Sequence, residues 1–137
     1  MSVHEAFLAK LRSNPRLADI VFDSDADMDD QPRPVPFVVV LRDNGDRTDP
    51  TPDQRLDFRQ RATDYEFQVQ CVSNSPTAAG NLALEVTATV LNQRLAVDGA
   101  STWPVRQVES NQIERDRTVT PNQWYSDDTY AVRTTPK

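Results

Sequence analysis

The stretch that decides the fold is Trp124-Tyr125-Ser126-Asp127-Asp128-Thr129-Tyr130-Ala131-Val132-Arg133-Thr134, near the end of a 137-residue chain. In its second half Tyr130, Val132 and Thr134 alternate with small or polar residues. A period of two residues is typical of a β-strand with one buried face. The sequence therefore predicts a strand over Thr129 to Thr134.

An aromatic pair stands at the entry to this strand. Trp124 and Tyr125 follow a Pro-Asn turn signal and precede two aspartates, so we expect them near the surface. Aromatic residues in such places are typical anchors of protein interfaces. The alternative is a small cluster that closes one end of the core.

A long helix is predicted upstream, from Ser75-Pro76 to about Leu95, with Gly99 in a turn beyond it. Serine is a preferred N-cap and proline a preferred first helical residue. The apolar residues of this segment form two stripes, where a surface helix of a monomer usually shows one. The first stripe is Ala79, Leu82, Ala83, Val86 and Val90, and the second is Leu84, Ala88, Leu91 and Leu95. The second stripe is either covered by the N-terminal helix or is a subunit contact with Leu84 and Leu91 as candidate interface residues.

The remaining elements are shorter. A capping box at Ser2 to Glu5 opens a helix that ends at Asn14-Pro15. Strands are predicted at Leu17 to Phe22, Val35 to Leu41, Tyr65 to Val72, Trp103 to Val108 and Ile113 to Val119. The second and third of these should pair as a hairpin that buries Phe67, Val69 and Cys71.

This order of elements predicts an α+β domain. We expect a mainly antiparallel sheet with one long and one short helix packed on one face. The chain is interpreted as a single domain over residues 1–137, with a tail at 135–137.

Two polar loops interrupt this pattern, at residues 23–34 and 43–53, and both are expected to be mobile. They contain Asp25, Asp27, Asp29, Asp46 and Asp49. The first loop places aspartates where a calcium loop begins, but Met28 replaces the glycine and Pro34 the bidentate glutamate of that motif. We therefore expect no tight calcium binding.

The composition argues against several kinds of chemistry. One histidine, one cysteine and three scattered glycines make a zinc site, a histidine-activated nucleophile or a phosphate loop implausible. The net charge of −6 disfavours binding to nucleic acid, and no apolar run is long enough to cross a membrane. These observations predict a protein that is not an enzyme and carries no cofactor or metal.

Arginines supply the other candidate contacts. Arg55, Arg59 and Arg61 lie in a segment expected to be an exposed edge strand leading into Tyr65 to Val72, and Arg115 and Arg117 lie in the penultimate strand. Between copies of the chain they could pair with aspartates and fix the register of an assembly. The alternative is a solvated strand face.

The whole arrangement resembles the tail terminator, or tail completion, proteins of bacteriophages with long non-contractile tails. The likeness rests on the order of the elements and on soft motifs. These are the Pro-Phe-Val-Val-Val strand from Pro36, Glu66-Phe67-Gln68-Val69-Gln70-Cys71, the helix start at Ser75-Pro76, Arg115-Asp116-Arg117 and the stretch from Trp124.

The resemblance implies a structural virion protein, made in the host bacterial cytoplasm and placed at the head-proximal end of the tail. Such proteins form a homo-oligomeric ring, a hexamer, that caps the tube after its last ring of major tail protein. The ring then offers the surface that joins the connector of the head. DNA passes through its acidic lumen without specific binding, the two polar loops would be contacts between rings, and no catalytic residue is implied.

Two other interpretations stay open. A head-closure or adaptor protein of the virion neck shares the small size and the ring habit. A monomeric α+β domain that binds a ligand or metal through its aspartate loop belongs to a different class.

Overall fold

The computed structural model describes residues 2–24, 34–42, 63–117 and 123–136. These residues form two helices, α1 (Val3–Arg12) and α3 (Pro76–Val90). The strands are β1 (Val21–Asp23), β2 (Phe37–Arg42), β3 (Thr63–Ser73), β4 (Ala100–Thr102), β5 (Arg106–Ser110), β6 (Glu114–Asp116) and β7 (Gln123–Pro136). The predicted α+β class is confirmed, although helices of 10 and 15 residues are not clearly one short and one long.

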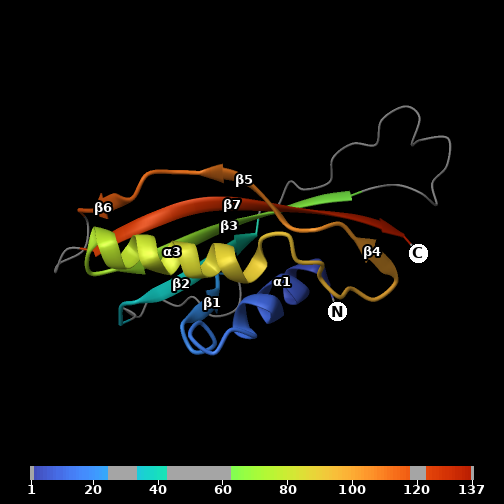
Figure 1. The fold of residues 1–137 in the computed structure, drawn as a ribbon, viewed down its shortest axis with the longest axis horizontal. Coiled ribbons are helices and arrows are strands. Elements are labelled where there is room, and N and C mark those ends of the chain that lie inside the picture. Colours follow the sequence, from blue (N-terminus) through green and yellow to red (C-terminus); the bar gives the residue numbers. More distant parts are fainter. Residues whose placement is uncertain (1, 25–33, 43–62, 118–122, 137) are drawn as a thin grey trace.

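The strands form one curled sheet in the order β1, β2, β3, β7 (Figure 1). The outer edge of β7 is shared by β4, β5 and β6, which pair with successive parts of it. The β1–β2 pair is parallel and the other pairs are antiparallel. The sheet is therefore mixed but mostly antiparallel, as expected.

The two longest strands, β3 and β7, form the centre of the sheet. They pair from Thr63 opposite Thr134 to Ser73 opposite Trp124, which places Phe67 opposite Tyr130. The predicted pairing of the strand at Tyr65 to Val72 with β2 is also confirmed. From Phe67 to Val72 β3 has a neighbour on each side, whereas its first four residues pair only with β7. The edge strand expected upstream, over Arg55 to Arg61, lies outside the described residues.

Both helices cover the same face of this sheet (Figure 1). Phe67, Val69 and Cys71 are fully buried on that face, as the alternation in the sequence predicts. Phe7 of α1 stacks on Phe67 with ring centroids 4.4 Å apart and lies 6.1 Å from the ring of Tyr130. The core therefore lies where α1 meets the middle of β3 and β7.

The N-terminal helix begins with the predicted capping box. Ser2 accepts a hydrogen bond from the Glu5 amide at 3.1 Å, and the Glu5 carboxylate accepts one from the Ser2 amide at 3.0 Å. Just after the helix, Asn14 donates to Glu85 Oε1 at 2.7 Å and to Thr89 Oγ1 at 2.9 Å. The segment after the first helix therefore bonds to the polar strip of α3. The predicted second stripe stays exposed at Leu84 and Ala88.

The long helix ends earlier than predicted, at Val90 rather than near Leu95. Asn92 adopts a left-handed backbone, with φ of 62°, which asparagine tolerates better than most residues. Beyond it the backbone pairs with Val105, which accepts from the Asn92 amide at 2.8 Å and donates to Gln93 at 2.9 Å. Leu95 thus belongs to a connecting segment, where it is buried in the core.

Several strand limits differ from the predictions. The first strand begins at Val21, because residues 14–20 form turns, and β5 begins at Arg106 rather than Trp103. The strand β6 covers only Glu114–Asp116, and β4 was not predicted. The last strand starts at Gln123 and continues to Pro136, so the expected tail is partly strand.

Other predictions fall on residues outside the described ranges. These are most of the loop at 23–34, the loop at 43–53 and the segment from Arg55 to Arg61. The interpretation as a single domain stays a prediction. Within the described residues no helix is long and apolar enough to cross a membrane.

Candidate functional site: a groove beside the long helix

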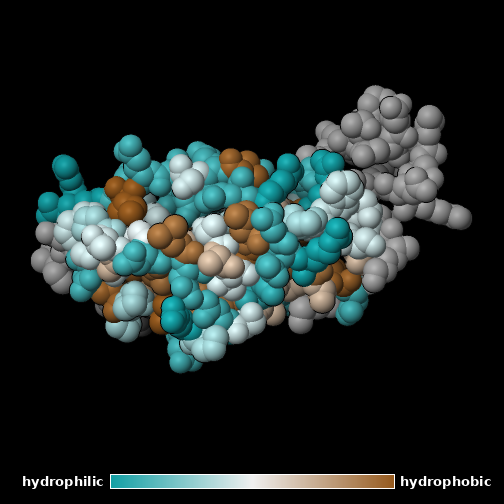
Figure 2. All heavy atoms as spheres, in the orientation of Figure 1, coloured by the Kyte–Doolittle hydropathy of each residue, from teal (hydrophilic) through white to brown (hydrophobic). Residues whose placement is uncertain are grey.

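A groove of about 720 Å³ runs between α3 and the segment that carries β5 and β6. Figure 2 shows this side of the molecule, with separate hydrophobic patches between α3 and the β5–β6 segment. Leu84 and Ile113 line its rim and are 70% and 37% exposed, and Ser126 and Asp128 of β7 line its buried floor. Two exposed apolar side chains thus stand among polar rim residues, above a buried polar floor.

A glycine in the helix sets the width of the groove. A Cβ at Gly80 would lie 3.2 Å from Cδ1 of Ile113, which is closer than ordinary van der Waals contact. The absence of a side chain at this position lets the β5–β6 segment approach the helix.

The floor holds a carboxylate in an unusual setting. Asp128 is 4% exposed, and its Oδ1 has no hydrogen-bond partner among the described residues. Burial raises the pKa of the Asp128 carboxyl above its ordinary value; a hydrogen bond from Ser110 acts against this, and the charge of Asp127 adds to it. A buried acceptor without a partner is costly, so this oxygen is suited to a donor from outside the chain.

The predicted aromatic pair lies at one end of β7, against β6. Both residues are half-buried; the guanidinium carbon of Arg115 lies 5.9 Å from the centroid of the Trp124 ring, and Tyr125 donates to Glu114 Oε2 at 2.9 Å. Each of these two aromatic residues is thus already in contact with β6 of its own chain.

A second hollow, of about 730 Å³, lies on the sheet face opposite the helices. Arg115, Arg117 and Tyr125 line it together with apolar residues of β2 and β3. The structure therefore brings these three predicted contact residues together and places them on the other side of the sheet from Leu84.

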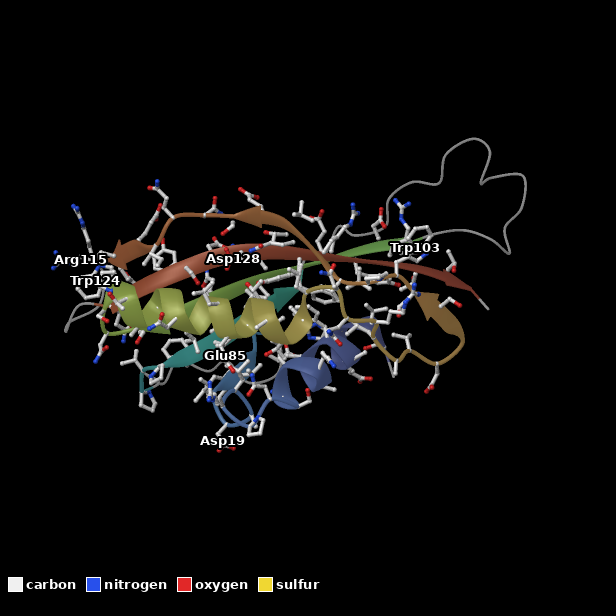
Figure 3. All side chains as sticks on the ribbon, viewed as in Figure 1. Asp19, Glu85, Trp103, Arg115, Trp124 and Asp128 are labelled. Atoms are coloured by element: carbon white, nitrogen blue, oxygen red, sulfur yellow. The ribbon has the colours of Figure 1, made fainter. Side chains whose placement is uncertain are left out.

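Sequence reasoning missed Trp103, which is 53% exposed. Figure 3 shows Trp103 at the opposite end of the long axis from Arg115 and Trp124. The guanidinium carbon of Arg133 lies 5.9 Å from the centroid of the Trp103 ring, and Arg133 also donates to both carboxylate oxygens of Asp64, at 2.8 and 3.0 Å. This hydrogen-bonded pair holds the pKa of Asp64 below its ordinary value. The sequence places Trp103 in an expected strand and contains no signal that it is exposed.

The other candidates divide into two groups. Leu91 is half-buried at the end of α3, and Arg117 is exposed. The remaining candidates lie outside the described residues: Arg55, Arg59, Arg61, Asp25, Asp27, Asp29, Asp46 and Asp49.

The start of the acidic loop is part of the core. Asp23 is buried, and its Oδ2 lies 2.9 Å from Nε2 of His4, whose ring stacks 5.8 Å from that of Phe67. Within residues 2–24, 34–42, 63–117 and 123–136, no group of three or more His, Cys, Asp or Glu could hold a metal ion.

Among the comparisons with known proteins, only the one with solved structures finds similar chains. No family model and no curated protein matches the sequence. A solved chain described as "Virion of native gene transfer agent (GTA) particle" is similar over 98% of this chain and 95% of its own length, with a TM-score of 0.70 and 15% identity. A second solved structure, whose description names no function, is similar over 96% of this chain and 92% of its own, with a TM-score of 0.57 and 16% identity. At these identities the likeness shows a shared fold.

Proposed function

We propose that this chain is a structural protein of a phage-like virion. The observation that carries the proposal is the likeness of fold, over nearly the full length of both chains, to a chain described as part of a gene transfer agent virion. Surface features of the described residues are consistent with assembly, because Leu84, Trp103, Val108 and Ile113 are large apolar side chains left exposed.

Within the virion, we propose the role of tail terminator. The order of elements resembles that family, and the net charge of −6 suits a lumen through which DNA passes without being held. In this role a homohexameric ring would cap the tail tube, stop its growth and present the surface that joins the head. Its partners would be further copies of the chain, the tail tube protein and a connector of the neck.

Deleting the gene from the phage that carries it tests this role directly. Tails seen by electron microscopy should be overlong and without heads, because nothing stops the polymerisation of the tube. Tails of normal length beside separate, filled heads would contradict a terminator and indicate a neck adaptor instead. Normal, infectious particles would contradict both.

A double substitution tests whether the aromatic pair contributes to assembly. Trp124→Ala with Tyr125→Ala should weaken ring formation more than it lowers the melting temperature, because both residues are half-buried near the surface. Trp103→Ala, which removes an exposed tryptophan at the other end of β7, shows whether any loss is specific to the end that carries the aromatic pair. Wild-type tail length and full infectivity from the double variant would exclude the pair as interface anchors.

A further inference from the structure

The charge of the groove beside α3 suggests what could fill it. Asp128 is the one charged residue among all those that line the groove; the others are apolar, amide or hydroxyl residues. Its carboxylate is buried and one of its oxygens has no partner in the described part of the chain. A complementary occupant would bring a cation to the floor and an apolar stem to the rim.

Arginine meets both conditions. Its guanidinium donates several hydrogen bonds in a fixed plane and keeps its charge when desolvated, and its methylene stem can pack against apolar side chains. In this chain the stem would lie between Leu84 and Ile113 while the guanidinium reaches Oδ1 of Asp128.

A neighbouring copy can supply that arginine. Copies in a ring meet through two different surfaces, so a groove that lies at the contact would receive a different surface of the next copy. Arg115 and Arg117 are exposed and line the hollow on the opposite face of the sheet, not the groove of their own copy. Asp116 also lines that hollow, so its two arginines leave it with one net positive charge, opposite in sign to the carboxylate of Asp128.

We propose that, in the assembled ring, the groove beside α3 receives Arg115 or Arg117 of the neighbouring copy, which pairs with Asp128. This inference rests on the proposed ring and assigns the contact that closes it. The rim residue Leu84 would become buried on assembly.

Thiol labelling measures that burial. Leu84→Cys should react with a maleimide in the free chain and at least about tenfold more slowly in assembled material separated by size. The native Cys71 is a silent background, because it is 1% exposed and burial raises its pKa to about 12. Asp19→Cys, exposed in the turn after α1, is the control that should stay reactive in both states (Figure 3).

A pair of charge-removing substitutions tests the role of the carboxylate. Asp128→Asn should weaken assembly at least about tenfold, the loss expected for one charge-assisted hydrogen bond, without lowering the melting temperature of the free chain. Asp127→Asn is the matched control, because Asp127 lies on the other face of β7 and is bonded to Gln68 at 2.8 Å. Equal assembly by the two variants would overturn the proposal.

A double-mutant cycle identifies the partner. Arg115→Gln combined with Arg117→Gln should weaken assembly about as much as Asp128→Asn, and adding Asp128→Asn should cause little further loss. Independent, additive losses would contradict the pairing.

The outcomes separate this inference from the function on which it rests. A ring that forms while Leu84→Cys stays reactive overturns the groove contact and leaves the ring intact. A chain that stays monomeric at its highest attainable concentration overturns the groove contact, and deletion of the gene then decides the function separately.

Discussion

Two halves of one sheet face have opposite characters. Around Phe67 and Tyr130 the face is filled by α1, and these side chains are fully buried. A few residues earlier on β7, Ser126 and Asp128 lie on the same face at the buried base of the groove, which α3 and the β5–β6 segment border. One alternating strand therefore supplies both a packed apolar core and the polar floor of an open groove, and the change falls between Asp128 and Tyr130.

The packed half should carry most of the stability. Phe67→Ala should lower the free energy of unfolding by about 3–5 kcal/mol, because it removes a fully buried ring that stacks on Phe7 and leaves a cavity in the central strand. Denaturant unfolding followed by circular dichroism gives the value.

Leu84→Ala is the comparison from the open half. Since Leu84 is 70% exposed, its loss should change the stability of the free chain by less than about 0.5 kcal/mol. Similar costs for Phe67→Ala and Leu84→Ala would break the contrast between the two halves.

The start of α3, which borders the groove, should depend on its cap. Ser75 accepts a hydrogen bond from the Ala78 amide at 3.1 Å. Ser75→Ala should therefore cost about 1 kcal/mol, the typical value for a lost N-cap, in equilibrium unfolding. Ser75→Asp should retain most of that stability, and a loss as large as that of alanine would exclude the cap as the cause.

The buried carboxylate of Asp128 should lower the folding stability of the free chain at neutral pH. Its folded pKa is raised above the ordinary 3.8, so the folded chain binds a proton more readily and stability falls as pH rises through that range. Asp128→Asn should therefore stabilise the free chain at pH 7 by up to about 1 kcal/mol. The gain should disappear below the ordinary pKa, where the parent carboxyl is protonated in both states.

The carboxyl of Asp64 should have the opposite effect on how stability depends on pH. Its pKa is lowered by Arg133, so its contribution is present above pH 3.8 and is lost as pH falls through the lowered pKa. Asp64→Asn should destabilise the chain slightly at pH 7 and have no effect in strong acid. Both variants should be unfolded across a range of pH. If Asp128→Asn and Asp64→Asn changed the stability at pH 7 in the same direction, this assignment would be wrong.

The smallest expected effect concerns the width of the groove. Gly80→Ala should stabilise the free chain by about 0.5 kcal/mol, because alanine favours the helix and only the flexible end of Ile113 must shift by a few tenths of an ångström. Thermal unfolding would show the gain. A clear loss of stability would mean that the β5–β6 segment cannot move away from the added methyl group.

The packed half could be predicted from the sequence because its signals are local. Phe67, Val69 and Cys71 alternate with polar residues, and so do Tyr130 and Val132, so their shared face follows from the strand period. The capping box at Ser2 and the N-cap and proline at Ser75-Pro76 correctly predicted the starts of both helices for the same reason.

The elements that were missed depend on distant partners. The end of α3 is set by the pairing of Asn92 and Gln93 with Val105, and β4 and β6 exist because β7 offers them an edge. A three-residue strand has too short a pattern to be recognised in isolation.

Only part of the candidate site could be predicted from the sequence. Leu84 was predicted as a contact residue from the second stripe, and the structure leaves it exposed. The floor was missed although Ser126 and Asp128 continue the alternation of Tyr130 and Val132 on the same face. Because these two residues are polar, the predicted strand begins too late, at Thr129 rather than Gln123.

The three short strands along β7 have a consequence for the free chain. An edge of 14 residues with unpaired amides and carbonyls would be a template on which other chains could add strands and aggregate. In the described part of the chain, β4, β5 and β6 occupy successive portions of that edge, and β1 at the other side of the sheet is only three residues long. Both sides of the sheet therefore end in short strands, which are poor templates for the addition of another chain.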